Sequence, residues 1–193
     1  MTAGEIRTLL ARAYAQDPLL AWVFPDEQHR LEATAAWLGV SVERYLAAGE
    51  VDRTHEDGAL TAVALWRRPG TVLAGPPDQL PTAAGLLRAL VGADRAAEIA
   101  AGFEATPRLA ADVPAAHLHF LAVAPGAQGR GLGGPLLDRV LAQSHADGVP
   151  LRLDTTNPAN LRFYEAHGLR VVTEGRLGPT GPAIWRLESD RPR

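Results

Sequence analysis

Apolar residues recur at helical spacing in the N-terminal part of the chain. One such stretch ends near Asp17-Pro18, and a second runs from about Glu27 to Ala48. Between them, Leu19 to Pro25 is apolar and aromatic but short, so we expect it to pack irregularly against the core; Trp22 and Phe24 could instead line a substrate pocket. The pattern therefore predicts two helices joined by an irregular segment.

The pattern then changes to the alternation typical of strands. Residues Val51 to Glu56 and Ala59 to Trp66 alternate between apolar and polar, and Asp57-Gly58 lies between them. This dipeptide favours a two-residue hairpin turn because both residues tolerate the positive φ angles that the turn requires. The sequence therefore predicts an antiparallel pair of strands.

The next stretch, Thr71 to Pro114, is rich in Gly, Pro and Ala. Within it, Pro81 to Val91 and Asp94 to Thr106 have the periodicity of short helices, with Asp94 as a candidate N-cap. We interpret the stretch as an insertion that covers the sheet or lines a substrate entrance. The chain as a whole, residues 1–193, is then one domain.

The C-terminal half alternates strands and helices. A strand at His117 to Val123, a glycine-rich turn, a helix ending at Ala146 and a strand at Leu151 to Thr155 form a βαβ-like unit. Asn157 then caps a helix that starts with Pro158. Two antiparallel strands follow, at Arg170 to Glu174 and Ala183 to Leu187. The fold class predicted is α/β, with a mixed, mostly antiparallel sheet flanked by helices.

The glycine-rich turn spans Gln128-Gly129-Arg130-Gly131-Leu132-Gly133. A turn that leads from a strand into a helix presents free backbone N–H groups at the positive end of the helix dipole, and such groups bind phosphate. Pro135 removes one N–H group near the helix start, so we expect the helix to begin late. The phosphates should then rest on the turn more than on the helix.

Composition narrows the range of functions. The formal net charge is −3 and all 19 basic residues are Arg, so no dense patch of Lys and Arg indicates nucleic-acid binding. The chain has no Cys, which excludes a disulfide scaffold, a thiolate metal cluster and a cysteine nucleophile. No apolar run approaches the length of a membrane helix. We expect a cytoplasmic protein without nucleic-acid or membrane partners.

Two motifs give the chain a specific family resemblance. The first is the turn from Gln128 to Gly133, which fits the pattern (Gln/Arg)-x-x-Gly-x-(Gly/Ala). The second is Asn157 to Gly168, a helix that begins with Asn, contains Phe-Tyr-Glu and ends in His-Gly. Together they resemble the GNAT superfamily of acetyl-CoA-dependent N-acetyltransferases. Leu65-Trp66 through Pro69-Gly70 and the C-terminal half look most like the bacterial puromycin-resistance type. Leu169 departs from the Phe that is usual after His-Gly, which affects packing more than chemistry.

The resemblance implies the GNAT fold, with a splayed pair of parallel strands, and acetyl-CoA as co-substrate. The turn would hold the pyrophosphate, the strand before it would pair with the pantetheine arm, and a backbone N–H near Val123 would polarise the thioester carbonyl. The residues that this implies for donor binding are Leu121, Ala122, Val123, Gln128, Gly129, Arg130, Gly131, Leu132, Gly133, Gly134 and Asn160.

The resemblance also implies catalytic roles. Tyr164, four residues after Asn160 on one helical face, would donate a hydrogen bond or a proton to the departing CoA thiolate. His117 and His119 lie two apart on one face of a strand, and the matching pair in arylalkylamine N-acetyltransferases serves as base. Both could instead be hydrogen-bonded core residues. A metal is not expected, because the His-x-His pair lacks a third ligand nearby.

Three interpretations of function remain. The first is direct transfer of an acetyl group to a primary amine of a small molecule or a protein. The second is a non-catalytic module that binds or senses acyl-CoA. The third is an NAD-dependent oxidoreductase, since Gly129 to Gly134 also matches G-x-G-x-x-G; there, however, the first glycine should follow the strand almost directly. The acceptor and the choice between monomer and homodimer stay open.

Overall fold

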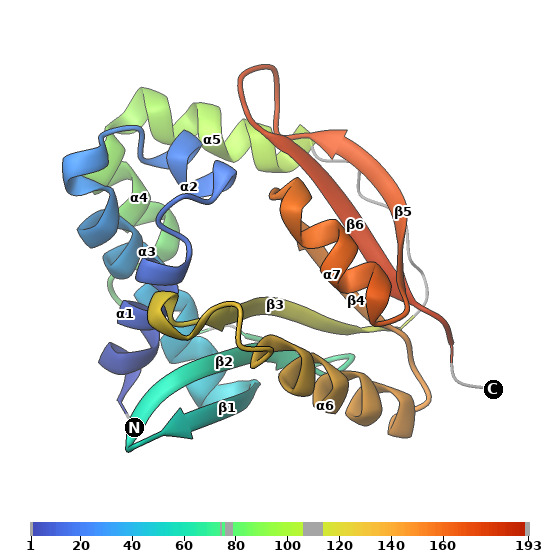
Figure 1. Ribbon diagram of the computed structural model, residues 1–193. Coiled ribbons are helices and arrows are strands. Elements are labelled where there is room, and N and C mark those ends of the chain that lie inside the picture. The colour runs from blue at the N-terminus through green and yellow to red at the C-terminus, as the bar shows by residue number, and fades with distance from the viewer. Residues whose placement is uncertain (1, 74, 76–78, 106–113, 192–193) are drawn as a thin grey trace.

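The structure, a computed structural model, describes residues 2–73, 75, 79–105 and 114–191 (Figure 1). The helices are α1 (Ala3–Ala13), α2 (Pro18–Val23), α3 (Glu27–Ala48), α4 (Ala83–Val91), α5 (Ala93–Ala105), α6 (Gly133–Ala146) and α7 (Leu161–Ala166), with 3-10 turns η1 (Pro125–Ala127) and η2 (Pro158–Asn160). The strands are β1 (Glu50–Glu56), β2 (Ala59–Arg67), β3 (Ala116–Val123), β4 (Leu151–Thr155), β5 (Leu169–Arg176) and β6 (Ala183–Ser189).

The strands form one sheet in the order β1-β2-β3-β4-β6-β5. All neighbours are antiparallel except β3 and β4, which are parallel. That parallel pairing runs only from Ala116 opposite Leu151 to Leu118 opposite Leu153. Beyond Leu118 the two strands diverge, and the sheet opens into two halves (Figure 1). The predicted mixed sheet and its splayed parallel pair are confirmed.

A β-bulge shifts the register of β3 immediately before this opening. Leu65 on β2 lies opposite Phe120 and Trp66 lies opposite Leu118, so His119 is the extra residue without a partner. Along a regular strand, residues two apart point to the same face of the sheet. The extra residue in the bulge breaks this alternation, so the residues on its two sides point to opposite faces. Leu118 packs into one core and Phe120 into the core on the other face.

The two faces of the sheet carry separate hydrophobic cores. Helices α1 to α5 cover one face, where Ile6, Val42 and Ile99 are fully buried. Helices α6 and α7 cover the other, where Leu137, Val140 and Tyr164 pack against β3 and β4. Helices from both halves of the chain therefore border the opening between β3 and β4 (Figure 1).

The N-terminal predictions hold with two exceptions. Helix α1 ends at Ala13, before the predicted end near Asp17-Pro18. Helix α3 has the predicted bounds, and Asp57 and Gly58 take φ angles of 49° and 79° in the predicted hairpin turn. The irregular segment expected over residues 19–25 is wrong, because α2 is a helix. Asp17 caps it by accepting a hydrogen bond from the Leu19 N–H at 2.9 Å, and Pro18 at its first position has the φ angle of a helix.

The predicted insertion contains the two expected helices with small differences. Helix α4 is capped by Thr82, whose hydroxyl accepts a hydrogen bond from the Gly85 N–H at 3.0 Å. Asp94 lies in the first turn of α5 and does not cap it, because the helix already begins at Ala93. Residue 106, the predicted end of this helix, lies outside the described residues, as do 74, 76–78 and 107–113.

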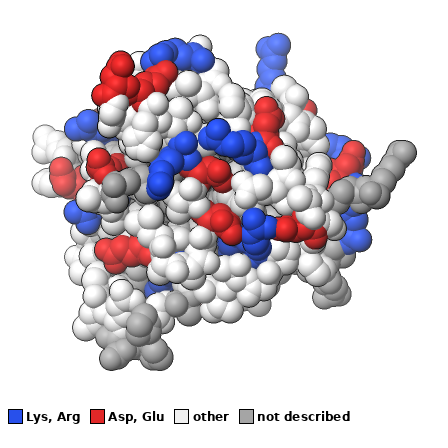
Figure 2. Space-filling view, turned by 90° about the horizontal axis from the view of Figure 1, so that it is seen from below, with Lys and Arg blue, Asp and Glu red and all other residues white. Residues whose placement is uncertain are grey.

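Charged residues of both signs share the surface. Figure 2 shows Arg side chains intermixed with Asp and Glu over one face of the molecule. Ion pairs join the first hairpin to the C-terminal half: Arg130 pairs with Glu56 at 2.9 Å, and Arg68 pairs with both Glu50 and Asp147. In the part of the chain that the structure describes, no helix is long and apolar enough to cross a membrane.

Candidate active site

The glycine-rich turn leads into α6 with its backbone exposed. Gly129 and Gly131 take φ angles of 75° and 78°, which explains the need for glycine there. Leu132 occupies the N-cap position and makes no side-chain hydrogen bond to the helix, so its first-turn N–H groups lack a capping side chain. The late start expected for the helix is wrong, because Pro135 is its third residue and is tolerated within the first turn.

A cavity of about 580 Å³ lies against this turn, and we call it the turn cavity. Its walls are the turn itself, the end of α1, strand β3 and the η2-α7 segment. Of the residues expected to bind a donor, it brings together Leu121, Ala122, Val123, Gln128, Gly129, Gly131, Leu132, Gly133, Gly134 and Asn160. Arg130 is the exception, because its guanidinium pairs with Glu56 on β1.

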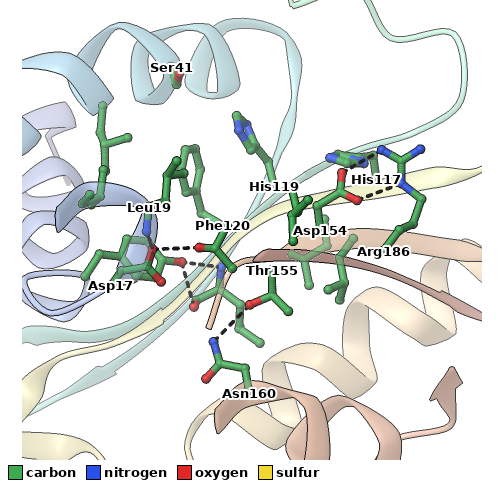
Figure 3. A pocket seen from close by; sticks show the side chains of 18 of the residues that line it. Asp17, Leu19, Ser41, His117, His119, Phe120, Asp154, Thr155, Asn160 and Arg186 are labelled. Carbon is green, nitrogen blue, oxygen red and sulfur yellow. Dashed lines mark hydrogen bonds and ion pairs between the residues drawn. The ribbon is translucent and has the colours of Figure 1, made fainter. Parts of the chain in front are cut away.

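A second cavity of about 630 Å³ lies on the other side of the opening, and we call it the histidine cavity. His117 and His119 line it from β3, Asp154 from β4 and Ser41 from α3 (Figure 3). Ala83 and Phe103 of the predicted insertion also contribute to its wall. Its lining is more apolar than polar, which is typical of a site for a small organic ligand.

The two cavities meet at one place, which we call the junction. The residues that line both are Tyr14, Asp17, Leu121, Asn160 and Tyr164. They come from the end of α1, from β3 beyond the bulge, and from the η2-α7 segment, so the diverging strands make the passage between the cavities. A molecule in the turn cavity can therefore reach a molecule in the histidine cavity only across these side chains.

The main chain of β3 faces the junction. The Tyr14 hydroxyl donates to the Leu121 carbonyl at 2.9 Å and accepts from the Leu121 N–H at 3.1 Å. The Val123 carbonyl accepts a hydrogen bond from the Gln128 side-chain amide at 3.1 Å. The edge of β3 that we expect to pair with a pantetheine arm is thus exposed to the opening. At Leu121, however, the main-chain N–H and carbonyl already form hydrogen bonds with the Tyr14 hydroxyl.

Tyr164 is buried at the junction with its ring against Phe163, at 5.2 Å between centroids. Burial, and secondarily the charge of Asp17, raise the pKa of its hydroxyl. The hydroxyl makes no hydrogen bond to any described residue. Tyr164 is therefore a neutral donor without a protein acceptor. Asn160 lies close by, with its amide 3.5 Å from the Thr155 hydroxyl.

His117 and His119 line one cavity, with their ring centroids 6.1 Å apart, although the bulge at His119 interrupts the regular strand on which a shared face was expected. His119 stacks on Phe120 at 4.0 Å and projects into the cavity (Figure 3). Desolvation inside the cavity lowers the pKa of each to about 4. The nearby charge of Arg67 lowers both pKa values further, whereas Asp154 opposes the shift. Both imidazoles are neutral at pH 7 and can accept a proton.

The remaining carboxylates of the cavities differ in their partners. Asp154 receives two hydrogen bonds from Arg186, at 2.7 and 2.9 Å, which balance its charge. Asp17 accepts from the Leu19 N–H and from the Thr156 hydroxyl at 3.1 Å, and burial raises its pKa. Among the described residues, no group of three His, Asp or Glu side chains could hold a metal ion.

Tyr14 and Asp17 are functional candidates that sequence reasoning missed. In the sequence they belong to the end of the first helix, far from the glycine-rich turn. The only local signal was the Asp-Pro pair, which marks the helix cap at Asp17. Their place at the junction depends on how α1 crosses β3, which no local pattern predicts.

Two cavities are joined where the parallel strands β3 and β4 diverge, and the glycine-rich turn, of the kind that binds phosphate, lines one of them. This arrangement is that of a protein that brings a phosphate-containing ligand to a second ligand. A sequence profile described as the acetyltransferase (GNAT) family matches residues 21–169. The chain belongs to this family, and the enzymes of the family use acetyl-CoA as co-substrate.

Solved structures share the fold at low sequence identity. A protein from Corynebacterium glutamicum, described as histone acetyltransferase HPA2 and related acetyltransferase, has a TM-score of 0.67 and 23% identity over 99% of this chain and 92% of that chain. A polyamine N-acetyltransferase from Drosophila melanogaster has a TM-score of 0.53 and 17% identity, covering 96% and 93%. Naa20 from Chaetomium thermophilum has a TM-score of 0.51 and 15% identity, covering 99% and 84%.

Proposed function

We propose that the protein transfers an acetyl group from acetyl-CoA directly to a primary amine of a small molecule. The observation that supports this most is the junction, where a cavity with a phosphate-type turn meets a cavity with two neutral histidines. Donor and acceptor would occupy separate cavities and meet at Tyr14, Asn160 and Tyr164. The related polyamine N-acetyltransferase shows that the fold accommodates acetylation of a small amine.

The turn fits the donor's pyrophosphate. The positive φ angles of Gly129 and Gly131 turn successive N–H groups outward, and the uncapped first turn of α6 adds the positive end of the helix dipole. The pantetheine arm would follow the free edge of β3 from Val123 toward Leu121. The Val123 N–H faces the opening, as its carbonyl does, and would hydrogen-bond the thioester oxygen. Such a donor is worth about 3–4 kcal/mol in other enzymes.

The histidine cavity would activate the amine. An ammonium must lose a proton before its nitrogen can attack the thioester carbon. His119 and His117 line this cavity and are placed to take the proton, directly or through water; a pKa of about 4 makes them weak bases, so the transfer is uphill and is drawn forward by attack on the thioester. Attack forms the C–N bond and leaves one excess proton on the nitrogen. As the C–S bond breaks, that proton passes to the leaving thiolate, whose charge the Tyr164 hydroxyl stabilises by a hydrogen bond until it is protonated. The acetamide and CoA are the products.

Neither Cys nor an activated Ser is present in the described cavities to form a covalent acyl-enzyme. The chain has no Cys, and Ser41 in the histidine cavity lies on α3 without a hydrogen bond to any described residue that could activate it. Direct transfer within a ternary complex is therefore the mechanism we propose. Initial rates at varied concentrations of both substrates should give intersecting double-reciprocal lines. Parallel lines would instead indicate an acyl-enzyme.

Thiol release from acetyl-CoA, measured against a panel of primary amines, tests the function. We expect stoichiometric acetamide and CoA with at least one amine. Acetyl-CoA binding without turnover of any amine in the panel would favour the non-catalytic module. Enhanced NADH fluorescence on addition of the protein, with no acetyl-CoA binding, would favour the oxidoreductase.

A further inference from the structure

A third cavity, of about 280 Å³, adjoins the histidine cavity at the side away from the junction. We call it the arginine cavity. It shares Ser41, His117 and His119 with the histidine cavity, so the two histidines form the boundary between them. Its remaining polar lining consists of Arg44 and Tyr45 on α3 and Arg67 at the end of β2.

The two arginines differ from most other arginines around the site. Arg186 is balanced by Asp154 and Arg68 by Glu50, but neither Arg44 nor Arg67 has an ion-pair partner among the described residues. Arg67 donates one hydrogen bond, from Nη1 to the Thr71 carbonyl at 3.2 Å. Its other N–H groups are available to a ligand, because a guanidinium carries five.

Arg67 lies beside the two histidines. It is opposite His117 in the pairing of β2 with β3, and it lines the arginine cavity together with Tyr45, His117 and His119. Its positive charge lowers the pKa values of both imidazoles. No carboxylate lines this cavity in the described chain. Two half-buried positive charges without a counterion make it an anion site.

The far end of the joined cavities has the opposite charge. Asp17 lies at the junction and has no cationic partner among the described residues, whereas Asp154, between the two ends, is balanced by Arg186. From the junction outward, the acceptor side thus presents a carboxylate, then two neutral histidines, then two arginines. A ligand that matches this order has a cationic end and an anionic end.

We propose that the acceptor is an amine that also carries a carboxylate or phosphate group, and that Arg44 and Arg67 bind this anionic group while the amine lies at the junction. The inference rests on the proposed function and specifies its substrate class. Arginine suits the role because its planar fork pairs with two oxygens of a carboxylate or phosphate. Neutral amines of the same length lack this contact.

A matched series of acceptors tests the proposal on the wild-type protein. The series pairs each linear ω-amino acid with the n-alkylamine of the same chain length, and each aminoalkyl phosphate with the corresponding amino alcohol. We expect kcat/KM to be about tenfold to a hundredfold higher for the anionic member at the optimal length, the effect of a hydrogen bond to a charged group. The carboxylate and phosphate arms show which anion is preferred.

Charge variants test the assignment to the two arginines. Arg67→Gln and Arg44→Gln should remove most of the preference, because KM should rise far more for the anionic acceptors than for the neutral amines, and the ratio is taken within each variant. Arg67→Lys should retain part of the preference. Arg88→Gln is the matched control, because Arg88 is exposed on α4, does not line the cavities, and its loss removes the same charge.

The outcomes separate this inference from the proposed function. If no amine of either type is acetylated, the proposed function fails. If neutral and anionic amines are acetylated with equal kcat/KM, acetyl transfer stands and the anion site is overturned. Should the arginine variants not fold, the wild-type series still decides. A preference that survives in both Gln variants would also overturn the assignment.

Discussion

Tyr164 combines two properties that suit a donor to a leaving thiolate. Its burial keeps the hydroxyl protonated, and the described chain offers that hydroxyl no acceptor. A phenol with a raised pKa is a weaker acid than a thiol, so complete proton transfer would be unfavourable. A hydrogen bond to the developing charge requires no such transfer. The structure therefore favours stabilisation of the thiolate over full protonation by Tyr164.

Replacing Tyr164 with Phe should lower kcat by about tenfold to a hundredfold, corresponding to the loss of a hydrogen bond to a charged group worth about 1.5–3 kcal/mol. The KM for acetyl-CoA should change little, because the hydroxyl acts on charge that develops only during C–S cleavage. Steady-state kinetics measures both quantities. An unchanged kcat would remove Tyr164 from the mechanism, provided the chemical step limits the rate.

Tyr14 occupies main-chain groups of β3 that the donor would also use. Its hydroxyl makes both hydrogen bonds of the Leu121 peptide groups that face the opening between β3 and β4. In the free protein it thus satisfies half-buried main-chain groups at the opening. The same groups lie on the edge where we place the pantetheine arm. Donor binding and the Tyr14 hydroxyl should therefore compete for Leu121.

Tyr14→Phe should destabilise the free protein by about 1–2 kcal/mol, because Leu121 loses its partner. In the acetyl-CoA complex the pantetheine arm would supply that partner, so the variant should bind acetyl-CoA more tightly than wild type. Urea unfolding with and without acetyl-CoA measures both effects. Tyr45→Phe removes the same atom outside the turn cavity and should leave acetyl-CoA affinity unchanged. Weaker binding by Tyr14→Phe would show that the hydroxyl contacts the donor itself.

At the scale of elements, the turn before α6 depends on backbone conformations that only some residues adopt. Gly131 takes a φ angle of 78°, whereas Gly126 in η1 has no positive φ and has space for a side chain. Both glycines lie between β3 and α6, on either side of Gln128. They allow the same substitution to be compared at a strained and an unstrained position.

Gly131→Val should abolish acetyl-CoA binding, because a β-branched residue strongly disfavours this φ angle and the turn would change shape. Gly126→Val should bind acetyl-CoA as wild type does. Isothermal titration calorimetry with acetyl-CoA compares the two, with circular dichroism to verify that each variant folds. If Gly131→Val binds normally, the pyrophosphate does not rest on this turn.

Elements with strong local signals were predictable from the sequence. The Asp57-Gly58 hairpin follows from two residues that tolerate positive φ, so neighbours in sequence suffice. Asn157 is a cap as predicted, but it caps the 3-10 turn η2, and the helix α7 begins only at Leu161. Helix α2 was missed because six residues carry too little periodicity, although its Asp17 cap was visible. The bulge at His119 and the approach of Tyr14 to Leu121 arise from contacts between distant segments, which periodicity does not record.

At the scale of the whole molecule, one departure from regular pairing produces the site. The bulge at His119 turns β3 just where its pairing with β4 ends, so the same strand faces α3 with its histidines and the turn cavity with Leu121. One hydrophobic core packs helices α1 to α5 against β2 and β3, and the other joins β2 and β3 to β4 and β6. The cavities therefore form between elements from both halves of the chain.

The lowered pKa values of half-buried His117 and of the more exposed His119 make stability depend on pH, with the firmer contribution from His117. The pKa of each is about 4 in the folded protein, against about 6.5 in an unfolded chain. Between these values the unfolded chain binds more protons than the folded one, so stability falls as pH decreases from about 6.5 to about 4. Neighbouring Arg67, Arg152 and Arg186 increase the effect, and Asp154 reduces it.

Urea unfolding across this pH range should show a weaker acid dependence when both His117 and His119 are replaced by Gln, because Gln takes up no proton in either state. His55→Gln, at an exposed position of β1, should retain the wild-type dependence. The double variant should also lose acetyl transfer if the histidines serve as base, although its folded state should tolerate acid better. An unchanged pH dependence of stability would mean that the two imidazoles titrate in the folded protein much as they do in an unfolded chain, which would make them stronger bases than a pKa of about 4 allows.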